Sequence, residues 1–382
     1  MIYRFARLGT LLKTWIRKDV ILSVSTVCAL LSMIFVPPSG TYVGYIDFKV
    51  LALLFCLMTV VAGFQECGLF VFAARKLLSG NNNLRLLAWM LIMLPFFSSM
   101  VITNDVSLIT FVPFAILILK MTGQKEHLAQ IVVLQTIGAN LGSMTTPIGN
   151  PQNLFLYGKY AIPAGSFFAL LLPLTGLSFL LLTLSVLGLP KKSMEIHFEE
   201  AKNTLPSPGK LLLFAFLFLL CLLSVFRLLP YEAVLGAVIL SLLIFDRPLF
   251  LAADYLLLLT FVAFFIFAGN MGQIEGIKRI FGSMLRINPV LFSAAASQFI
   301  SNVPAAVLLS GFTENWKALL VGTNLGGLGT PIASLASLIS LKFYIKEMPF
   351  NTRAYLTAFT LLNIIFFIIL YFSSAVSITS LS

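Results

Sequence analysis

The sequence predicts an all-α polytopic membrane protein that is built as an inverted repeat. We expect two re-entrant hairpins, two broken transmembrane helices and about nine full spans. The 382-residue chain is 59% hydrophobic and only 10% charged, with a mean hydropathy of +1.01, whereas soluble globular domains carry about 25% charged residues. Apolar runs of about 20 residues recur along the chain, and each can cross a bilayer as a helix. The polar interruptions of these runs occur twice, in the same order.

This composition excludes several classes of protein. It is too apolar for an ordinary soluble enzyme, for a disordered protein or, despite the formal net charge of +11, for a protein that binds nucleic acid. Alternating ten-residue strands are absent, which argues against an outer-membrane barrel. The four cysteines have no metal-ligand spacing. No histidine, paired acid or cysteine cluster forms a catalytic set, and no nucleotide-binding loop is present. We therefore expect neither an enzyme nor a resident cofactor.

The first half, residues 1–189, forms the first repeat. Its first 18 residues hold five basic residues and no acid, which predicts a cytoplasmic N-terminus. The expected elements are spans at about 20–36 and 50–65, an interfacial segment at 66–78, a re-entrant hairpin at about 86–120, a broken helix at about 127–160 and a span at 166–189. The interfacial segment mixes apolar residues with Arg75 and Lys76.

A polar linker at residues 190–210 divides the chain. It holds four lysines, and its prolines and Gly209 are typical of a loop. Residues 211–382 contain one extra span and then the second repeat. The expected elements are spans at about 211–229, 233–245 and 249–271, a mixed segment at 273–286, a re-entrant hairpin at about 289–312, a broken helix at about 316–346 and a last span at 355–372.

The breaks reveal the repeat. When Gly138 is aligned with Gly322, an ungapped match also pairs the following residues: Asn140 with Asn324, Gly142 with Gly326, Thr146 with Thr330, and Pro147 with Pro331. The hairpin tips match as Ile102-Thr103-Asn104 and Ile300-Ser301-Asn302. If the hairpins do not cross, four spans precede the linker. The linker is then cytoplasmic, and the second repeat starts on the opposite side. Lys278, Arg279 and Arg286 would then face outward against the positive-inside rule, so the side of residues 272–288 stays open.

The polar tips and breaks are the candidate binding site. An interrupted helix exposes N–H groups that attract anions and carbonyl groups that coordinate cations. Two tips that face two breaks would form one polar chamber near the middle of the membrane. The candidate residues are Thr103, Asn104, Asp105, Asn140, Thr145, Thr146, Pro147, Asn150, Ser301, Asn302, Asn324, Thr330 and Pro331. Asp105 is the acid at a tip, and it can ligate a cation, carry a coupling proton or cap a helix.

The strings Thr145-Thr146-Pro147-Ile148-Gly149-Asn150-Pro151-Gln152-Asn153 and Leu325-Gly326-Gly327-Leu328-Gly329-Thr330-Pro331-Ile332 resemble motifs of the ion transporter superfamily. This group includes citrate transporters, divalent anion:sodium symporters, arsenite permeases and certain sodium/proton antiporters. The resemblance implies that the tips bind substrate carboxylates. It also implies sodium sites at Asn104, Asp105 and Gly142, and at Ser301, Asn302 and Gly326. Homodimerisation through the scaffold helices is a further implication. The third residue of each tip departs from the family's Ser-Asn-Thr pattern.

The favoured function is ion-coupled secondary transport of a small anion by alternating access. The anion would be a carboxylate, such as citrate or a dicarboxylate, or another oxyanion. Efflux of arsenite or another metalloid is the alternative, and sodium/proton antiport is the second alternative. Sodium or the proton would be the coupling ion. A passive channel fits less well because polarity is concentrated at two tips and two breaks. We expect the protein in the plasma (inner) membrane, with the bilayer, the anion and the cation as its partners.

Overall fold

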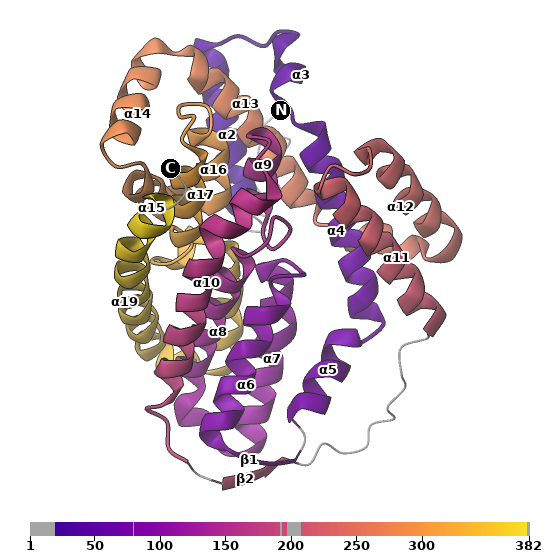
Figure 1. Cartoon of the computed structure of the whole chain (residues 1–382), viewed down its shortest axis with the longest axis vertical. Coiled ribbons are helices and arrows are strands. Elements are labelled where there is room, and N and C mark those ends of the chain that lie inside the picture. Colours follow the sequence, from indigo (N-terminus) through magenta and orange to yellow (C-terminus); the bar gives the residue numbers. More distant parts are fainter. Residues whose placement is uncertain (1–19, 79, 192, 197–207, 380–382) are drawn as a thin grey trace, which may run out of the picture.

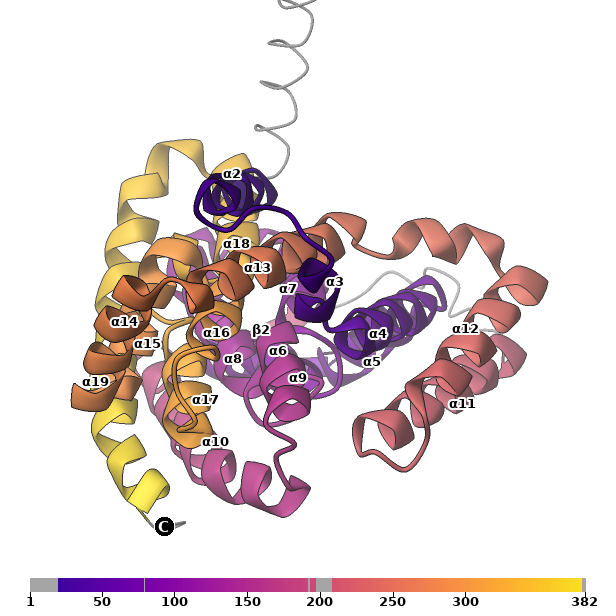
Figure 2. The ribbon, with the colours of Figure 1, turned by 90° about the horizontal axis from the view of Figure 1, so that it is seen from above.

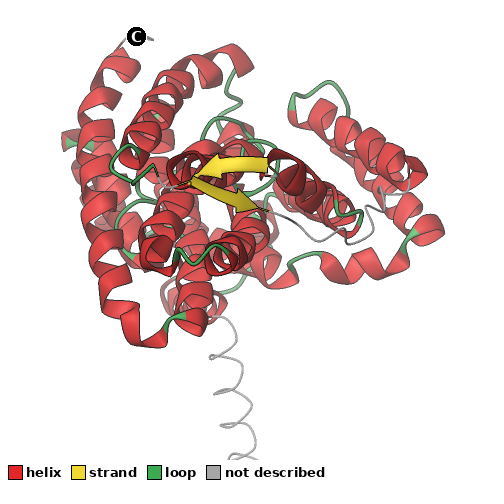
Figure 3. Cartoon of the chain, turned by 90° about the horizontal axis from the view of Figure 1, so that it is seen from below, coloured by secondary structure: helices red, strands yellow, loops and turns green. Residues whose placement is uncertain are grey.

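A computed structural model describes residues 20–78, 80–191, 193–196 and 208–379. Helices make up nearly all of it, and a single short antiparallel sheet lies at one end (Figure 3). The basic N-terminus and residues 197–207 of the linker lie outside the described residues.

The first half contains the following elements: α2 (Val20–Phe35), α3 (Thr41–Tyr45), α4 (Phe48–Glu66), α5 (Leu69–Leu78), β1 (Gly80–Asn83), α6 (Leu84–Ser98), α7 (Asn104–Met121), the 3-10 helix η1 (Lys125–His127), α8 (Leu128–Ser143), α9 (Pro151–Lys159) and α10 (Ala164–Val186). Helices lie within a few residues of the expected ranges, and turns at 99–103 and 144–150 coincide with the predicted polar tip and break. The break is the non-helical segment 144–150 between α8 and α9.

The second half contains the following elements: β2 (Ser193–Ile196), α11 (Pro208–Val225), α12 (Tyr231–Phe245), η2 (Arg247–Ala252), α13 (Tyr255–Gln273), α14 (Glu275–Ile287), α15 (Pro289–Ile300), α16 (Asn302–Leu309), α17 (Trp316–Leu325), η3 (Pro331–Ala333), α18 (Leu335–Glu347), η4 (Pro349–Asn351) and α19 (Thr352–Thr379). Two expected boundaries differ by six or seven residues. The last span, predicted to end at residue 372, continues to Thr379 in α19. The span predicted from residue 249 starts at Tyr255, because Asp254 accepts a hydrogen bond from Leu257 N (2.9 Å) and so caps α13.

Six of the described helices are long and apolar enough to cross a membrane: α4, α7, α10, α11, α13 and the helix that ends at Thr379. Four shorter apolar helices accompany them, at Leu22–Phe35, Leu84–Ser98, Tyr231–Phe245 and Pro289–Ile300. The chain is therefore a polytopic membrane protein. The expected total of about nine spans depends on how the shorter and broken helices lie in a bilayer.

The short sheet was not predicted. β1 precedes the first hairpin, and β2 lies in the linker that was expected to be a loop. The two strands pair antiparallel, with Gly80 opposite Ile196 and Asn83 opposite Ser193. They lie at the opposite end of the molecule from α3 and α14 (Figure 1).

Each hairpin packs on a broken helix of its own half and on a broken helix of the other half. The first hairpin, α6 and α7, packs on α8 of its own half and, through α7, on α18 of the other half. The second hairpin, α15 and α16, packs on α17 of its own half and, through α16, on α9 of the first half. The helices α11 and α12 lie together beside α4, away from the second hairpin and α19 (Figure 2).

Glycines set the close approach within each half. Gly138 and Gly142 lie one turn apart on α8, and Gly322 and Gly326 are their counterparts at α17. A Cβ at Gly142 would overlap the backbone oxygen of Phe96 in α6, and one at Gly322 would lie 2.6 Å from the backbone oxygen of Val290 in α15. Small residues four apart allow helix backbones to touch in this way.

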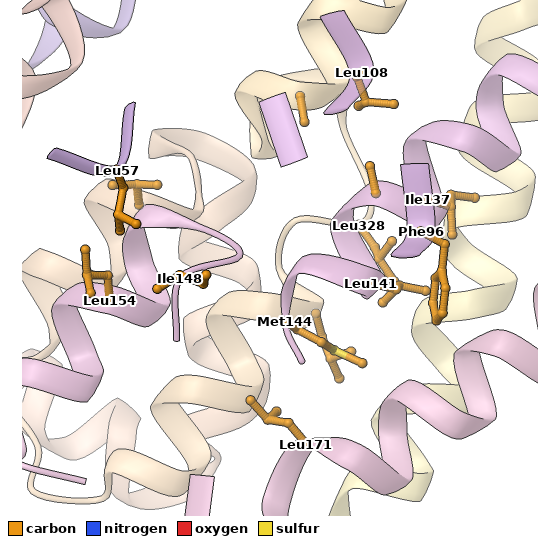
Figure 4. Packing of buried hydrophobic residues seen from close by; sticks show 14 of the residues in the cluster. Leu57, Phe96, Leu108, Ile137, Leu141, Met144, Ile148, Leu154, Leu171 and Leu328 are labelled. Carbon is orange, nitrogen blue, oxygen red and sulfur yellow. The ribbon is translucent and has the colours of Figure 1, made fainter. Parts of the chain in front are cut away.

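The breaks contribute to the hydrophobic core as well as to the polar site. The second break is the segment 326–334 between α17 and α18, which includes η3. Met144 and Ile148 in the first break and Leu328 in the second are all buried. Figure 4 shows Met144 beside Leu171 and Leu328 near Leu141. Burial of these side chains anchors the non-helical segments among the helices.

Candidate functional site

The tip of each hairpin is attached to the break of its own half. In the first half, Asn104 N donates a hydrogen bond to Gly149 O (3.2 Å), and Thr146 Oγ1 donates to Met100 O (2.6 Å). In the second half, Thr330 Oγ1 donates to Gln298 O (3.3 Å). Thr146 and Thr330 are matched residues of the repeat, so the two halves use the same contact.

The second tip turns sharply at Ser301, which has a φ of +71°. Its hydroxyl donates to Ala333 O (3.3 Å) and so joins the tip to the segment that leads into α18. Positive φ is costly for a residue with a side chain and persists where surrounding contacts hold it. The next residue, Asn302, begins α16 and is 4% exposed.

Asn140 is the centre of the first polar cluster. Its Oδ1 accepts hydrogen bonds from Asn104 Nδ2 (2.9 Å) and Ser334 Oγ (3.0 Å). Its Nδ2 donates to Gly327 O (3.3 Å) and Ser337 Oγ (3.4 Å). A residue in the last turn of α8, just before the first break, therefore holds the first hairpin tip and the beginning of α18 together.

Asn324, the counterpart of Asn140, is the centre of the second cluster. Its Oδ1 accepts from Asn150 Nδ2 (3.0 Å), and its Nδ2 donates to Asn153 Oδ1 (2.7 Å). The repeat alignment pairs Asn150 with Ser334 and Asn153 with Ser337. Each central asparagine thus contacts the matched residues of the opposite half.

Four helices begin around one small cavity between the tips. Its volume is about 10 Å³, and the residues that line it are Asn104, Asp105, Pro151, Gln152, Leu257, Asn302, Val303, Ser334 and Leu335. The N-termini of α7, α9, α16 and α18 are at Asn104, Pro151, Asn302 and Leu335. The first turns of these helices, which carry the positive ends of the helix dipoles, therefore border the same space.

Asp105 is the one charged residue among those described that line this cavity. Its Oδ1 is buried and has no hydrogen-bond partner within the described part of the chain. Asp105 also lines a larger cavity of about 260 Å³, together with Gln65, Thr260 and the exposed Asp254. The carboxyl group thus lies where the two spaces adjoin.

The other predicted residues take different places. Thr145 pairs with Thr175 in α10, with a hydroxyl separation of 3.0 Å. Thr146 and Thr330 attach the tips, and Thr330 is exposed. Pro147 lies in the first break and Pro331 begins η3. Gly142 serves the contact with α6 described above.

Several site residues were missed by the sequence reasoning. Gln152, Ser334 and Val303 line the cavity, and Asn153 and Ser337 belong to the two clusters. A signal for some of them was present, because the ungapped alignment of the breaks extends to Asn150–Ser334 and Asn153–Ser337. Within the described residues, no group of histidine, cysteine or acidic side chains can hold a metal ion.

Comparison with known proteins agrees with this architecture. Residues 10–315 match the family described as "Citrate transporter". The chain is 33% identical over 306 residues to an uncharacterized transporter of Methanocaldococcus jannaschii, with 78% of this chain and 81% of that protein covered. It is 29% identical over 335 residues to the inner membrane protein YbiR of Escherichia coli, with coverages of 84% and 89%. A shorter match, 31% over 129 residues, covers 34% of this chain and 26% of the silicon efflux transporter LSI3 of Oryza sativa subsp. japonica.

Proposed function

Because the chain belongs to the citrate transporter family, and is therefore a transporter and not an enzyme, we propose that it is an ion-coupled secondary transporter of a small anion. The observation that carries this proposal is the convergence of four helix N-termini on one cavity that no lysine or arginine lines within the described residues. Helix N-termini bind anions through free N–H groups and the dipole, without a cationic side chain.

The chemistry of the cavity favours a carboxylate or another oxyanion. Asn104 and Asn302, one from each tip, line the cavity and carry neutral amide groups. With a volume of about 10 Å³, the cavity has room for about one water molecule, so the tips must separate before an anion enters. We expect a small anion such as citrate, a dicarboxylate or an inorganic oxyanion.

Asp105 provides the coupling in this proposal. Two like unit charges 4 Å apart repel each other by roughly 4 kcal/mol at an effective dielectric constant of 20. An anion can share the cavity with Asp105 only when a proton or a sodium ion neutralises the carboxylate. Binding of the anion and of the cation is then linked, which is the requirement for symport.

Alternating access follows from the inverted repeat. The exchanged packing of the two hairpins and the two broken helices supports a pseudo-twofold arrangement around the cavity. A rigid-body movement of the hairpins and broken helices against α4, α11 and α12 would open the cavity to one side and then to the other. We place the N-terminus and the linker in the cytoplasm, and we expect a homodimer.

Efflux of a neutral metalloid hydroxide, such as arsenite, is the second candidate. The neutral polar clusters around the cavity and the match to a silicon efflux transporter favour it. Sodium/proton antiport without an organic substrate is the third candidate.

Transport by reconstituted protein tests these candidates. The purified chain is placed in liposomes, and uptake of citrate, C4-dicarboxylates, sulfate and arsenite is measured under imposed sodium and proton gradients. We expect gradient-driven uptake of one of the anions, with loss of that uptake in Asn104→Ala and Asn302→Ala and normal membrane insertion of both variants. Wild-type uptake in both variants would contradict the proposed site.

A further inference from the structure

The carbonyl groups at the two breaks are already occupied by side-chain amides. In an interrupted helix, the free carbonyl groups at the C-terminal end of the helix segment before the break are the usual ligands of a coupling cation. Here an amide NH₂ group donates hydrogen bonds to these carbonyl groups in each break. An NH₂ group carries two positively polarised hydrogens and accepts no hydrogen bond. It therefore binds the same carbonyl oxygen atoms that a cation would bind.

Gln298, in the last turn of α15, occupies the second break. Its Nε2 donates to Gly326 O (2.9 Å), to Leu328 O (3.0 Å) and, in its own helix, to Ala294 O (3.0 Å), and its Oε1 accepts from Thr330 N (2.8 Å). These four contacts fix the orientation of the amide, because a reversed group would set its oxygen against three carbonyl oxygens. The side chain thereby fills the space among the backbone groups of the break.

Gly329 makes room for this amide. A Cβ at this position would overlap Oε1 of Gln298, and Gly329 has a φ of +121°, which L side chains rarely adopt. In the first half, the matched positions hold Thr145 and Met100. Gly329 and Gln298, the two positions at which the second half differs from the first, therefore contact each other. The hydrogen bond from the Thr330 hydroxyl to Gln298 O is nevertheless the same as that from the Thr146 hydroxyl to Met100 O.

Asn153 occupies the first break in an equivalent way. Its Nδ2 donates to Met144 O (3.1 Å) and Thr146 O (3.0 Å), and more weakly to Ser143 O (3.4 Å). Met144 and Leu328 are matched residues of the repeat. The same carbonyl is thus satisfied by an amide in both halves, although the amides come from different elements.

We infer that the amides of Gln298 and Asn153 stand in place of cations at the two breaks, so that neither set of carbonyl groups binds sodium. Gln298 then determines the ion specificity of the second break. This inference rests on the proposed function, because a coupling-ion site has meaning only in a transporter. It leaves Asp105 as the remaining place for a coupling ion.

Thermal unfolding of the purified full-length protein tests the inference without a transport assay. Melting temperatures are compared in sodium chloride and in choline chloride at equal concentration, for wild type, Gln298→Ala, Gln298→Glu and a control, Gln273→Ala. Gln273 is an exposed glutamine whose amide donates to the hydroxyl of Tyr45 and not to a break. A ligand that binds only the folded state raises its stability, so a sodium site appears as a higher Tm in sodium than in choline.

We expect equal Tm values in the two salts for wild type and Gln273→Ala. Removal of the amide exposes the carbonyl groups of Gly326 and Leu328, and a carboxylate in its place adds a negative charge. Both Gln298 variants should therefore be less stable in choline and regain several degrees of Tm in sodium, with the larger gain in Gln298→Glu. No sodium-specific gain in either variant would overturn the inference, because the carbonyl groups would not form a cation position.

Two further variants keep the test decisive. If the Gln298 variants do not fold, Gly329→Ala displaces the amide by a Cβ at the adjacent position, and the same sodium-dependent gain is expected. If the Tm of wild type is higher in sodium than in choline, Asp105→Asn shows whether sodium binds at a break or at the Asp105 carboxylate. A response that persists in Asp105→Asn comes from a break and overturns the inference. If the sodium-dependent gain in Tm disappears in Asp105→Asn, sodium binds at the carboxylate, and the carbonyl groups of the breaks bind no sodium, as proposed. Transport activity enters none of these measurements, so a failed uptake screen would leave their result unchanged.

Discussion

Substitution of Asn140 by alanine should abolish most transport. The side chain is 4% exposed and makes four hydrogen bonds of 2.9–3.4 Å that join the first tip, the second break and α18. A hydrogen bond contributes about 0.5–1.5 kcal/mol in soluble proteins and about 0.6 kcal/mol on average between membrane helices. The four bonds together therefore contribute roughly 2–4 kcal/mol, which corresponds to at least about a 30-fold loss in the ratio of uptake rate to KM.

The assay is initial uptake into proteoliposomes, with the amount of inserted protein measured for each variant. Ser178→Ala is the matched control, because Ser178 is equally buried but bonds only to Leu174 O in its own helix. A double-mutant cycle with Ser334→Ala should show a coupling of about 0.5–3 kcal/mol, as expected for residues in contact. Uptake by Asn140→Ala within a factor of two or three of that by Ser178→Ala would refute the role of the cluster.

Three other results are expected. Asp105→Asn should change the dependence of uptake on pH or sodium more than the choice of substrate; an unchanged ion profile would leave Asp105 without a role in coupling. Gly142→Ala should lower the yield of folded protein, because its Cβ would overlap the backbone of α6, whereas Gly165→Ala, with no atom within 4 Å, should not; similar yields measured by size-exclusion chromatography would contradict this packing. Cysteines at Ser193 and Ser39 should react with an impermeant reagent from opposite sides of the membrane, and labelling from the same side would refute the proposed topology.

Most helices could be predicted from the sequence because a bilayer imposes long apolar runs, and proline, glycine and asparagine interrupt these runs at the breaks. The resemblance to the ion transporter superfamily is confirmed by the match over residues 10–315. The pairing of β1 with β2 could not be predicted, because each strand has four residues and its partner is far away in the sequence. The helix start at Tyr255 was missed because the apolar residues 249–252 do not reveal that a 3-10 helix precedes the Asp254 cap.

The candidate site could be predicted only as far as the repeat was recognised. The pairing of Asn140 with Asn324 pointed to both clusters, but the partners of these residues lie on the opposite half, and no local pattern contains that information. Gln298 resembles any polar residue near a hairpin tip. Its role depends on the position of the second break, and the only local sign of it in the sequence is that Gly329 stands where the first half has Thr145.

The central claim is that the transported anion binds between the two hairpin tips. A cysteine in place of Val303, which lines the cavity and is 8% exposed, tests it most directly. The rate of its alkylation is measured with and without the anion that the liposome assay identifies, with a cysteine at Gly276 in α14 as the control. Saturating anion should slow alkylation at position 303 severalfold and leave position 276 unchanged. Equal rates at position 303 with and without the anion would contradict a binding site between the tips.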